Sequence, residues 1–542
     1  MTTCWEEGDP NSRLLVLAEA PGKSEVRLER PLVGPAGQVF SECLHTAGLA
    51  RSQCYILNLF PKYCYRDLGQ NLIEADRNIK VWDAKKGLTQ DGLELAHGAL
   101  ERIERSNANA ILSLGNPPLD ALLGEHRPIM KWRGSPLMGR GRKFIPTCHP
   151  AATLHGNYLW RYLIINDMKK IAQELDDPVL TLPQRNIHLR PTLADIGHFF
   201  HKCHSEGRGA TDLEIMNGQV YCFSLAWSPS EIMVIPFVNE LKQPWWDEQD
   251  EEIIWKWYAN FMSDPSVMKI NQNIVGFDTP FLYRYCNIHT KGPVGDTMIA
   301  QHIMYPEFLK GLDFIASIHT REPYWKDDGK IWKNLGNFDW EKFQRYNGTD
   351  SGVALEAWDA LYAEMKDKDF LQTYNMTVEM RNALTFMSTD GLAVDKKGLE
   401  ETNKLLEQQI IAKQTELNEA CGRDLNVNST KQCQDYFYAH LQLDPYKNRN
   451  GGLTTDDKAM SRIVRKASTG SKEAKLVQEV RRLKKLKSTY MEVEMDDDNR
   501  LRCSWNPRGT WTGRLSSSKT IMGTGMNLQN LDPEFKGFVV AG

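Results

Sequence analysis

Gly209-Ala210-Thr211-Asp212-Leu213-Glu214-Ile215 is the stretch that decides the fold of the middle of the chain. Its flanks are apolar, and a second apolar run follows it, Val220-Tyr221-Cys222-Phe223-Ser224-Leu225. Two such runs joined by a short polar connection predict a β-hairpin. Because successive side chains of a strand point to opposite faces, Asp212 and Glu214 share one face of the first strand. The sequence therefore predicts two carboxylates that point at the same place.

Two later segments supply further groups for the same site. The run 267–282 begins as an apolar, strand-like stretch and ends as a helix whose first turn carries Asp278. Tyr346 and Asp350 are four residues apart in a helical pattern, so they lie on the same helix face. Three of the acids also have a structural interpretation, since the Asp212-x-Glu214 pair fits a solvated strand face and Asp278 fits a helix N-cap.

Four carboxylates that converge in this way need cations. At about 5 Å and an effective dielectric near 20, each pair repels by roughly 3 kcal/mol. Two divalent ions about 3.5 to 4 Å apart remove this repulsion and clamp the attacking and leaving oxygens of a phosphodiester displacement. All-oxygen ligation favours Mg²⁺ or Mn²⁺ over zinc. The predicted metal ligands are Asp212, Glu214, Asp278 and Asp350.

This set of residues resembles the proofreading 3′-to-5′ exonucleases of the DnaQ-like (DEDD) superfamily, in their tyrosine subclass. The matching motifs are Asp212-x-Glu214, Asn273-x-x-x-Phe277-Asp278 and Tyr346-x-x-x-Asp350. The run 295–300 also matches a strand that such domains have in family A DNA polymerases. The resemblance implies a ribonuclease H-like domain over residues 186–368, in which the acids hold two Mg²⁺ (or Mn²⁺) and Tyr346 orients the attacking water. The aromatic and basic insert 323–330 fits either a guide for a frayed strand end or a surface loop.

Composition bounds the class of protein. At 542 residues, with 41% hydrophobic and 25% charged residues, the chain is globular and long enough for about three domains. It begins without a basic segment or apolar core and has no apolar run of 18 residues, so we expect no membrane association and a cytoplasmic location, in a bacterial host cell if the gene is phage-encoded. Eleven cysteines without a C-x-x-C pair indicate reduced thiols.

The first 180 residues alternate strand-like apolar runs with helical patterns. The runs lie at 12–17, 54–60, 110–115 and 144–147, and a long helical stretch is expected between the second run and Arg105. This alternation predicts a parallel sheet with its site at the carboxyl ends of the strands. Glu19, Asn58 and His149 stand at such ends.

With these residues at its strand ends, the region 1–178 resembles the uracil-DNA glycosylase superfamily. The resemblance is closest to family 4 and to the related domain fused to some bacteriophage polymerases. The resemblance implies a pocket in which a flipped uracil is recognised. Leu32 stands where the family has an aromatic residue that stacks on uracil, and the cysteines of the family's iron–sulfur cluster are absent, so no cluster is expected. We expect binding more than cleavage, and a purely structural His149 is an alternative. The implied pocket residues are Glu19, Pro21, Gly22, Leu32, Asn58 and His149.

The last part of the chain, 369–542, is mostly helical and basic. Residues 461–490 carry ten Lys or Arg against two Glu, although the net charge of the chain is -4. The segments 509–517 and 527–531 resemble the thumb and beginning of the palm of family A DNA polymerases. A solvated helix face and an ordinary Ser/Thr/Gly loop are the alternatives. The implied DNA contacts are Arg481, Lys484, Lys487, Thr510, Thr512, Arg514, Ser516, Ser517, Asn527 and Gln529.

Together the resemblances imply an α/β multidomain protein, the N-terminal part of a bacteriophage-type family A DNA polymerase. Its expected partners are primer-template DNA and single-stranded 3′ ends. The sequence stops before the first catalytic palm motif, so nucleotide addition is expected to need a second polypeptide that carries the remaining palm and the fingers. Two alternatives stay open, a uracil-processing repair enzyme and a non-catalytic DNA-binding platform.

Overall fold

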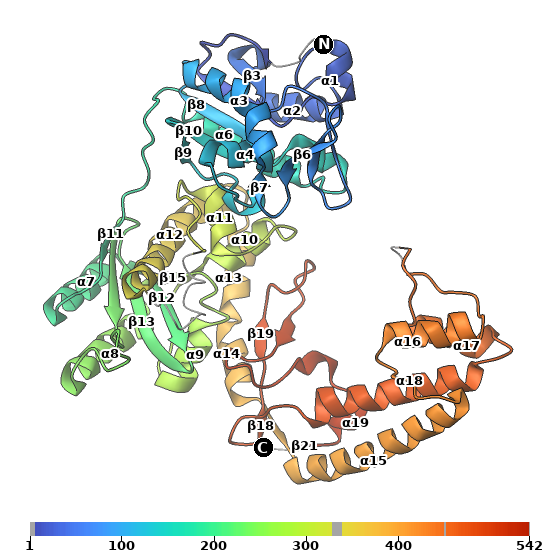
Figure 1. Cartoon of the computed structure of the whole chain (residues 1–542). Coiled ribbons are helices and arrows are strands. Elements are labelled where there is room, and N and C mark those ends of the chain that lie inside the picture. Colours follow the sequence, from blue (N-terminus) through green and yellow to red (C-terminus); the bar gives the residue numbers. More distant parts are fainter. Residues whose placement is uncertain (1–5, 328–338, 449–450, 541–542) are drawn as a thin grey trace. The chain divides into compact units, whose positions relative to one another are not determined.

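The computed structural model describes residues 6–327, 339–448 and 451–540, and its chain forms two compact units (Figure 1). The first unit comprises Met1–Asp278 and Asn287–Val378, and the second comprises Thr279–Cys286 and Glu379–Gly542. Among the residues just given, no helix has the length and apolarity needed to cross a bilayer.

The first sheet has the strand order β1-β3-β2-β8-β10-β9, in which the four central strands are parallel. Successive residues of β2 contribute to opposite cores: Leu14 and Val16 pack beneath α2 and α6, and Leu15 packs beneath α3 and α4. The predicted parallel sheet is therefore confirmed. The bounds are β1 Glu6–Glu7, β2 Leu14–Ala18, β3 Cys54–Asn58, β8 Ala110–Leu114, β9 Leu137–Gly139, β10 Arg142–Thr147, α2 Pro35–Thr46, α3 Gln90–Arg105, α4 Asn116–Leu123 and α6 Trp160–Ala172.

The long helix expected before Arg105 is wrong in its first half. Residues 64–88 form a separate four-stranded antiparallel sheet, and α3 begins only at Gln90. The turns between the short strands explain the difference, because Gln70 and Asn78 have left-handed φ values of 61° and 53° and Asp83 accepts hydrogen bonds from two backbone N–H groups after it. Such turns stop a helix. The strands are β4 Cys64–Arg66, β5 Leu72–Glu74, β6 Ile79–Asp83 and β7 Gly87–Leu88.

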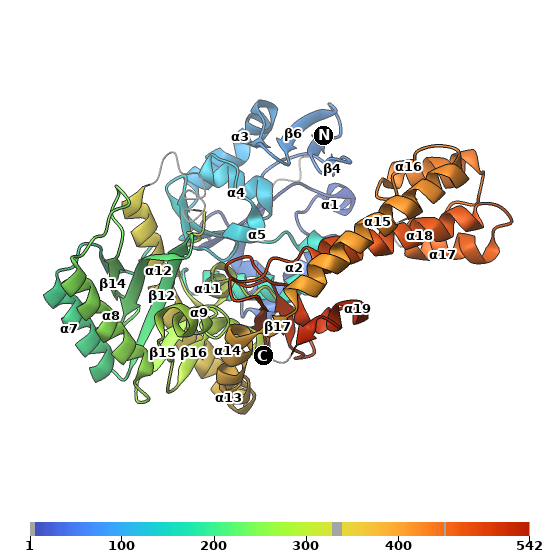
Figure 2. The ribbon, with the colours of Figure 1, turned by 90° about the horizontal axis from the view of Figure 1, so that it is seen from below.

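The second sheet has the order β11-β14-β13-β12-β15-β16. The predicted hairpin is β12 and β13, and β12 is parallel to β15 on its other side. Helices α7 and α8 cover one face of this sheet and α12 covers the other (Figure 2). The bounds are β11 Asn186–His188, β12 Arg208–Met216, β13 Gln219–Ala226, β14 Glu231–Pro236, β15 Met268–Asn271, β16 Val294–Asp296, α7 Leu193–Ser205, α8 Glu248–Ser263 and α12 Trp340–Asp367.

Two glycines let α12 lie unusually close to its sheet. A Cβ atom on Gly348 would lie 2.8 Å from Cγ2 of Ile187, and one on Gly352 would lie 2.4 Å from Cδ1 of Ile232. A larger residue at either position would force these isoleucine side chains or the helix to shift. The close approach brings the side chain of Ser351 within hydrogen-bonding distance of Ser224 on β13, at 2.7 Å between the hydroxyl oxygens.

A buried arginine, Arg133, links the two parts of the first unit that contain its two large sheets. The fully buried Arg133 donates to both carboxylate oxygens of Asp167 on α6, and its Nη1 donates to Oγ of Ser317, 2.8 Å away. Ser317 belongs to α11 (Leu312–His319), which follows the second sheet. Gly134 has a φ of +72°, and a Cβ atom there would lie 2.6 Å from the carbonyl oxygen of Ser317. Only glycine at position 134 therefore lets the backbone after Arg133 lie this close to the backbone of α11.

The second unit is built on a long antiparallel helix pair and a small sheet. Helices α15 and α18 lie side by side (Figure 1), and β17 pairs with β18 and β21. The helix break predicted near Gly391 is present, since α14 ends at Asp390 before β17. The bounds are α14 Arg381–Asp390, α15 Lys396–Cys421, α18 Ser471–Leu486, β17 Leu392–Val394, β18 Arg500–Leu501, β19 Ser504–Asn506, β20 Ser516–Ser518 and β21 Val539–Val540.

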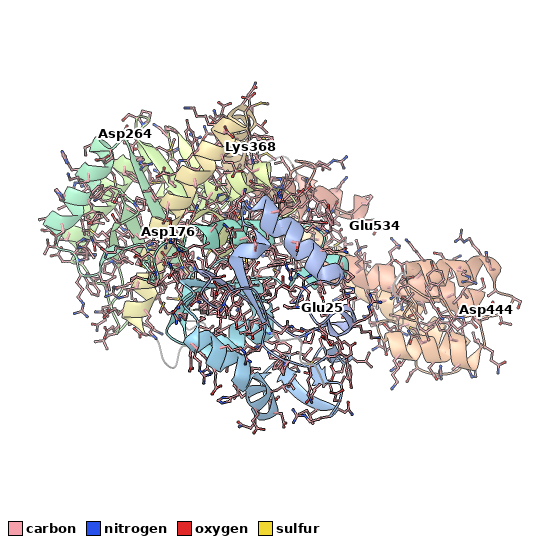
Figure 3. The ribbon with its side chains drawn as sticks, turned by 90° about the horizontal axis from the view of Figure 1, so that it is seen from above. Glu25, Asp176, Asp264, Lys368, Asp444 and Glu534 are labelled. Atoms are coloured by element: carbon pink, nitrogen blue, oxygen red, sulfur yellow. The ribbon has the colours of Figure 1, made fainter. Side chains whose placement is uncertain are left out.

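Replacing Asp167 with alanine should destabilise the first unit by about 3 to 5 kcal/mol, because the buried guanidinium of Arg133 loses its counter-charge. The matched control is Asp176→Ala, which removes an ion pair between Asp176 and Arg13. The side chain of Asp176, labelled in Figure 3, is 94% exposed and that of Arg13 is 69% exposed. That change should cost less than about 1 kcal/mol. Urea unfolding of the full chain measures both. Equal effects of the two variants would contradict the structural role given to Arg133.

Candidate functional site

Three of the predicted acids meet between β12 and α12. Asp212 and Glu214 lie on the same face of β12, as the strand alternation predicts, and Asp350 faces them from α12. One carboxylate oxygen of each lies within 4.8 Å of the others. Asp278, the first residue of α9 (Asp278–Cys286), is linked to this group through Asn271, whose Nδ2 donates to Asp212 at 3.2 Å and to Asp278 at 3.1 Å. The structure thus brings all four acids together.

The rotamer of Asp212 is held from two sides. Its Oδ1 accepts from Asn271, and its Oδ2 accepts from Nδ2 of Asn347 at 2.9 Å. Asn347 also donates to the backbone oxygen of Asp212 at 3.0 Å. Neither asparagine was expected at the site from the sequence, although Asn347 stands next to Tyr346 and Asn271 stands two residues before Asn273. Their amide groups fix the carboxylate where it can bind an ion.

Asp296 of the run 295–300 has a structural role. Its carboxylate accepts hydrogen bonds from the backbone N–H groups of Asn273 and Val275, in the turn that precedes Asp278. It also accepts from two N–H groups at the start of α10 (Thr297–Met304), for which it is the N-cap. Asn273 adopts a left-handed φ of 65° in this turn. These two motif residues therefore shape the turn that positions Asp278.

Burial dominates the electrostatics of the acids. It raises the pKa of Asp212 to about 7, and the nearby charge of Asp350 adds to the effect. Burial, followed by the charge of Asp212, also raises the pKa of Glu214 and that of Asp278 well above the ordinary range. The phenol pKa of Tyr346 is raised by burial and by the same carboxylates, so its O–H stays protonated at neutral pH. The group therefore favours a bound cation or extra protons.

The donor set fits a divalent cation. All four side chains offer oxygen atoms, which hard ions such as Mg²⁺ and Mn²⁺ prefer. The Oδ1 atom of Asp278 is buried and has no hydrogen-bond partner. A buried carboxylate oxygen without a donor is costly unless an ion satisfies it. The residues present are thus chemically suited to hold a metal.

Part of the 323–330 insert enters the same site. Nε1 of Trp325 donates to Oδ1 of Asp350 at 2.7 Å, and the ammonium group of Lys326 pairs with Oδ2 of the same residue. Lys326 also donates to the hydroxyl of Tyr346 at 2.9 Å. Although burial lowers the pKa of Lys326, the charge of Asp350 and its neighbours raises it above the ordinary value. Of the two interpretations of the insert, a plain surface loop does not fit these contacts; residues 328–330 lie outside the described residues.

The predicted pocket of the first sheet lies at the carboxyl ends of its parallel strands. Glu19 follows β2, Asn58 ends β3 and His149 follows β10. A Cβ atom on Gly115 would lie 3.2 Å from Cβ of His149 and 3.8 Å from Oε2 of Glu19, so these two side chains are neighbours. Arg66, from β4, pairs with Glu19 at 2.7 Å. The edge of the sheet therefore carries a charged pair as well as the predicted residues.

His149 has a defined tautomer. Its Nδ1 accepts the N–H of Ala151 at 3.2 Å, which leaves the ring proton on Nε2. Burial lowers the pKa of His149, although the charge of Glu19 opposes this, so the ring is neutral at pH 7. The side chain can therefore donate one hydrogen bond from Nε2 to a ligand.

Leu32 and Glu25 shape the loop beside this pocket. Leu32 is buried in the core formed with α2 and has a left-handed φ of 48°. Glu25, labelled in Figure 3, accepts hydrogen bonds from the N–H groups of Val33 and Gly34 at 3.1 and 2.7 Å. Glu25, which lies next to Gly22 and holds this loop, was not expected from the sequence. Leu32 thus serves as a core residue.

In the second unit, Arg481 has a different position from the one expected of a DNA contact. Its guanidinium donates to the carbonyl oxygens of Val427 at 2.8 Å and Thr455 at 2.5 Å, so it holds the protein backbone. The exposed side chains of Thr512 and Arg514 lie in the loop between β19 and β20. Other predicted contacts hold this loop together: Thr510 donates to Arg514 O, Ser517 to Asn527 Oδ1 and Gln529 to Leu515 O. Lys484 donates to Gln414, Lys487 pairs with Glu492, and Ser516 lies on β20.

Two parts of the chain match known protein families. Residues 5–174 match the model of the uracil DNA glycosylase superfamily, and residues 396–535 match the model of DNA polymerase family A. The chain therefore combines a glycosylase-like domain with a region related to family A DNA polymerases, as both resemblances predict. The middle part lies outside these two matches, and its exonuclease assignment stays a prediction.

Two relatives in sequence agree with this division. The type-4 uracil-DNA glycosylase of Thermotoga maritima is 29% identical over 169 residues, 30% of this chain and 78% of that protein. DNA polymerase I of Borreliella burgdorferi is 27% identical over 278 residues, 49% of this chain and 29% of that protein. The chain thus spans under a third of that polymerase. The POL domain of Pol1 from M. smegmatis, solved with primer-template and dNTP, has a TM-score of 0.47 and 20% identity, and the match covers 64% of this chain and 56% of that chain.

Without divalent cations, the free energy of unfolding should fall as the pH rises from about 4 to about 7. The folded state keeps a proton on Asp212, whose pKa is about 7, whereas the unfolded chain loses it near the ordinary value of 3.8. The folded state therefore binds more protons over this window, and stability is lost as they leave. Urea unfolding in EDTA at several pH values measures the slope. Asp212→Asn should reduce the slope of the unfolding free energy against pH, and Glu206→Gln, at an exposed position, should not. An unchanged slope in Asp212→Asn would contradict the raised pKa of Asp212.

Proposed function

We propose that this chain is a proofreading component of DNA replication, with a metal-dependent 3′-to-5′ exonuclease in its middle part. The observation that carries the proposal is the convergence of Asp212, Glu214, Asp278 and Asp350 beside Tyr346, from elements that are far apart in the sequence. The family A polymerase region at 396–535 supports DNA as the substrate. We further propose that the polymerase is of the bacteriophage type implied by its glycosylase-like domain.

The four acids would hold two Mg²⁺ or Mn²⁺ ions, which supply a nucleophilic water at neutral pH and stabilise the leaving oxygen at phosphorus. Asn271 and Asn347 keep the carboxylate of Asp212 in one orientation, so no rotamer has to be selected when the ion arrives. The protonated phenol of Tyr346 donates a hydrogen bond at the position of the attacking water and orients it. The chain's own contribution is thus the fixed geometry of the acids and the phenol.

Asp212→Ala or Asp350→Ala should abolish release of 3′ nucleotides from labelled single-stranded DNA, because each removes a ligand that no other residue replaces. Tyr346→Phe should lower the rate by about 10- to 100-fold, since it removes only the orienting hydroxyl. Glu206→Ala, an exposed residue of the same domain, is the control. Digestion by Asp212→Ala at the wild-type rate would sink the proposal.

A second function is supported by the match of residues 5–174 to the glycosylase superfamily. We propose that this domain recognises a flipped uracil or a similar pyrimidine, through Asn58 and the Nε2–H of His149. Pro21 and Gly22 belong to the loop beside Glu19. Two observations disfavour efficient cleavage: Arg66 pairs with the Glu19 carboxylate, and Leu32 offers no aromatic ring for stacking.

The glycosylase-like domain should therefore bind uracil-containing DNA more readily than it releases uracil from it. With the full chain, a uracil-containing oligonucleotide should bind more tightly than its thymine counterpart, and Asn58→Ala should remove this difference. The expected loss is about 1 to 3 kcal/mol, the worth of good base-edge hydrogen bonds. Fluorescence anisotropy in EDTA measures binding without exonuclease action, and alkali-treated gels measure uracil release. Rapid release that depends on Asn58 would show that the domain is a working glycosylase.

The second unit is proposed to hold the primer-template duplex. The exposed Thr512 and Arg514 lie in a loop of short polar side chains, which suits contacts to the backbone and minor groove without sequence preference. The basic helix α18 would contribute Lys484, and Lys487 would contribute from the position directly after the helix. Arg481 is left out of the proposed contact set, because its guanidinium holds the protein backbone.

A further inference from the structure

Segment 320–327 contacts two domains of the first unit. On one side, Trp325 and Lys326 reach Asp350 in the acidic site. On the other side, neighbouring residues of the segment contact the glycosylase-like domain. The segment is short, so the two sets of contacts are coupled. Movement of the residues docked on the glycosylase-like domain also moves Trp325 and Lys326.

The contacts with the glycosylase-like domain are numerous and specific. The N–H of Tyr324 donates to Oγ of Ser135 at 3.2 Å, and the Tyr324 ring packs on Trp132 with 5.3 Å between ring centroids. Asp327 pairs with Lys131 at 2.9 Å. The carbonyl oxygen of Thr320 accepts from Lys170 on α6 at 2.6 Å, and Arg321 pairs with Glu174 at 2.6 Å. Lys131 and Trp132 belong to α5 (Ile129–Trp132).

The contacts in the acidic site use both oxygens of Asp350. Oδ1 accepts the indole N–H of Trp325, and Oδ2 pairs with the ammonium group of Lys326. A metal ion that binds Asp350 must displace at least one of these groups. The ammonium group of Lys326 and a divalent ion on the same carboxylate would repel each other. Lys326 and a divalent ion are therefore competitors for the same ligand.

We infer that segment 320–327 is a latch, held by the glycosylase-like domain, that keeps Lys326 on Asp350 and opposes metal loading of the exonuclease site. The inference rests on the proposed exonuclease function. Release of the segment from Lys131 and Trp132 lets Lys326 leave Asp350, and the ion then binds. The coupling is reciprocal, so metal binding loosens the docking of the segment by the same free energy. The state of the glycosylase-like domain thus sets how readily the exonuclease site is loaded.

The test is a Mn²⁺ titration of the full chain by calorimetry. Lys131→Glu replaces the attraction to Asp327 with repulsion and should tighten Mn²⁺ binding by about tenfold, equivalent to about 1.4 kcal/mol. Lys326→Ala should tighten it at least as much. The double variant Lys131→Glu, Asp327→Lys restores an ion pair and should return the affinity to the wild-type value. Lys86→Glu, the same charge change at an exposed turn of the same domain, is the control and should have no effect.

Hydrogen exchange supplies a second readout, because amides of 320–327 should exchange faster in the wild-type chain when Mn²⁺ is added. If the wild type binds Mn²⁺ and digests DNA but Lys131→Glu and Lys326→Ala match it in affinity, the latch is overturned and the exonuclease stands. If no variant binds Mn²⁺, both proposals are overturned. If Lys131→Glu does not fold, Asp327→Ala removes the same ion pair from the other side, and it should also tighten binding.

Discussion

Carboxylates that a fold brings together away from water repel one another, and the second sheet of the first unit is arranged around this repulsion. Burial alone raises the pKa of Asp212, Glu214 and Asp278, before the neighbouring charges are added. A fold keeps such a group only if something offsets the cost. In this chain the offset comes from amide donors, from one lysine and from the capacity to bind a divalent cation.

The architecture around the acids follows from the same constraint. Gly348 and Gly352 allow α12 to approach the sheet closely, which brings Asp350 opposite β12. Asn271 and Asn347 then supply N–H groups to Asp212. These asparagines cannot remove the net negative charge, so Lys326, a metal ion or added protons must do so. The competition between Lys326 and the ion is the point at which the neighbouring glycosylase-like domain can act on the site.

Local patterns made the acidic site predictable. The alternation of a strand placed Asp212 and Glu214 together, and the helical spacing of Tyr346 and Asp350 gave the opposing side. The ends of parallel strands gave Glu19, Asn58 and His149 in the same way, because a parallel sheet gathers such ends at one edge.

Other features depend on partners that are distant in sequence. Nothing near Arg133 in the chain marks Asp167 and Ser317 as its partners. Lys326 reaches Asp350 across 24 residues, and Arg481 reaches Val427 across 54. The small sheet at 64–88 was missed because its strands are too short for a clear period, and only the turns at Gln70 and Asn78 reveal it.

Electron paramagnetic resonance of the Mn²⁺-loaded chain can show whether the acids form a two-metal nuclease centre. Such a centre should bind two Mn²⁺ ions per chain and give the spectrum of a coupled pair, since ions in such sites lie about 3.5 to 4 Å apart. The coupled spectrum should disappear in Asp350→Ala. Binding of a single isolated ion, or a coupled spectrum that survives the loss of Asp350, would show that these acids do not form a two-metal centre.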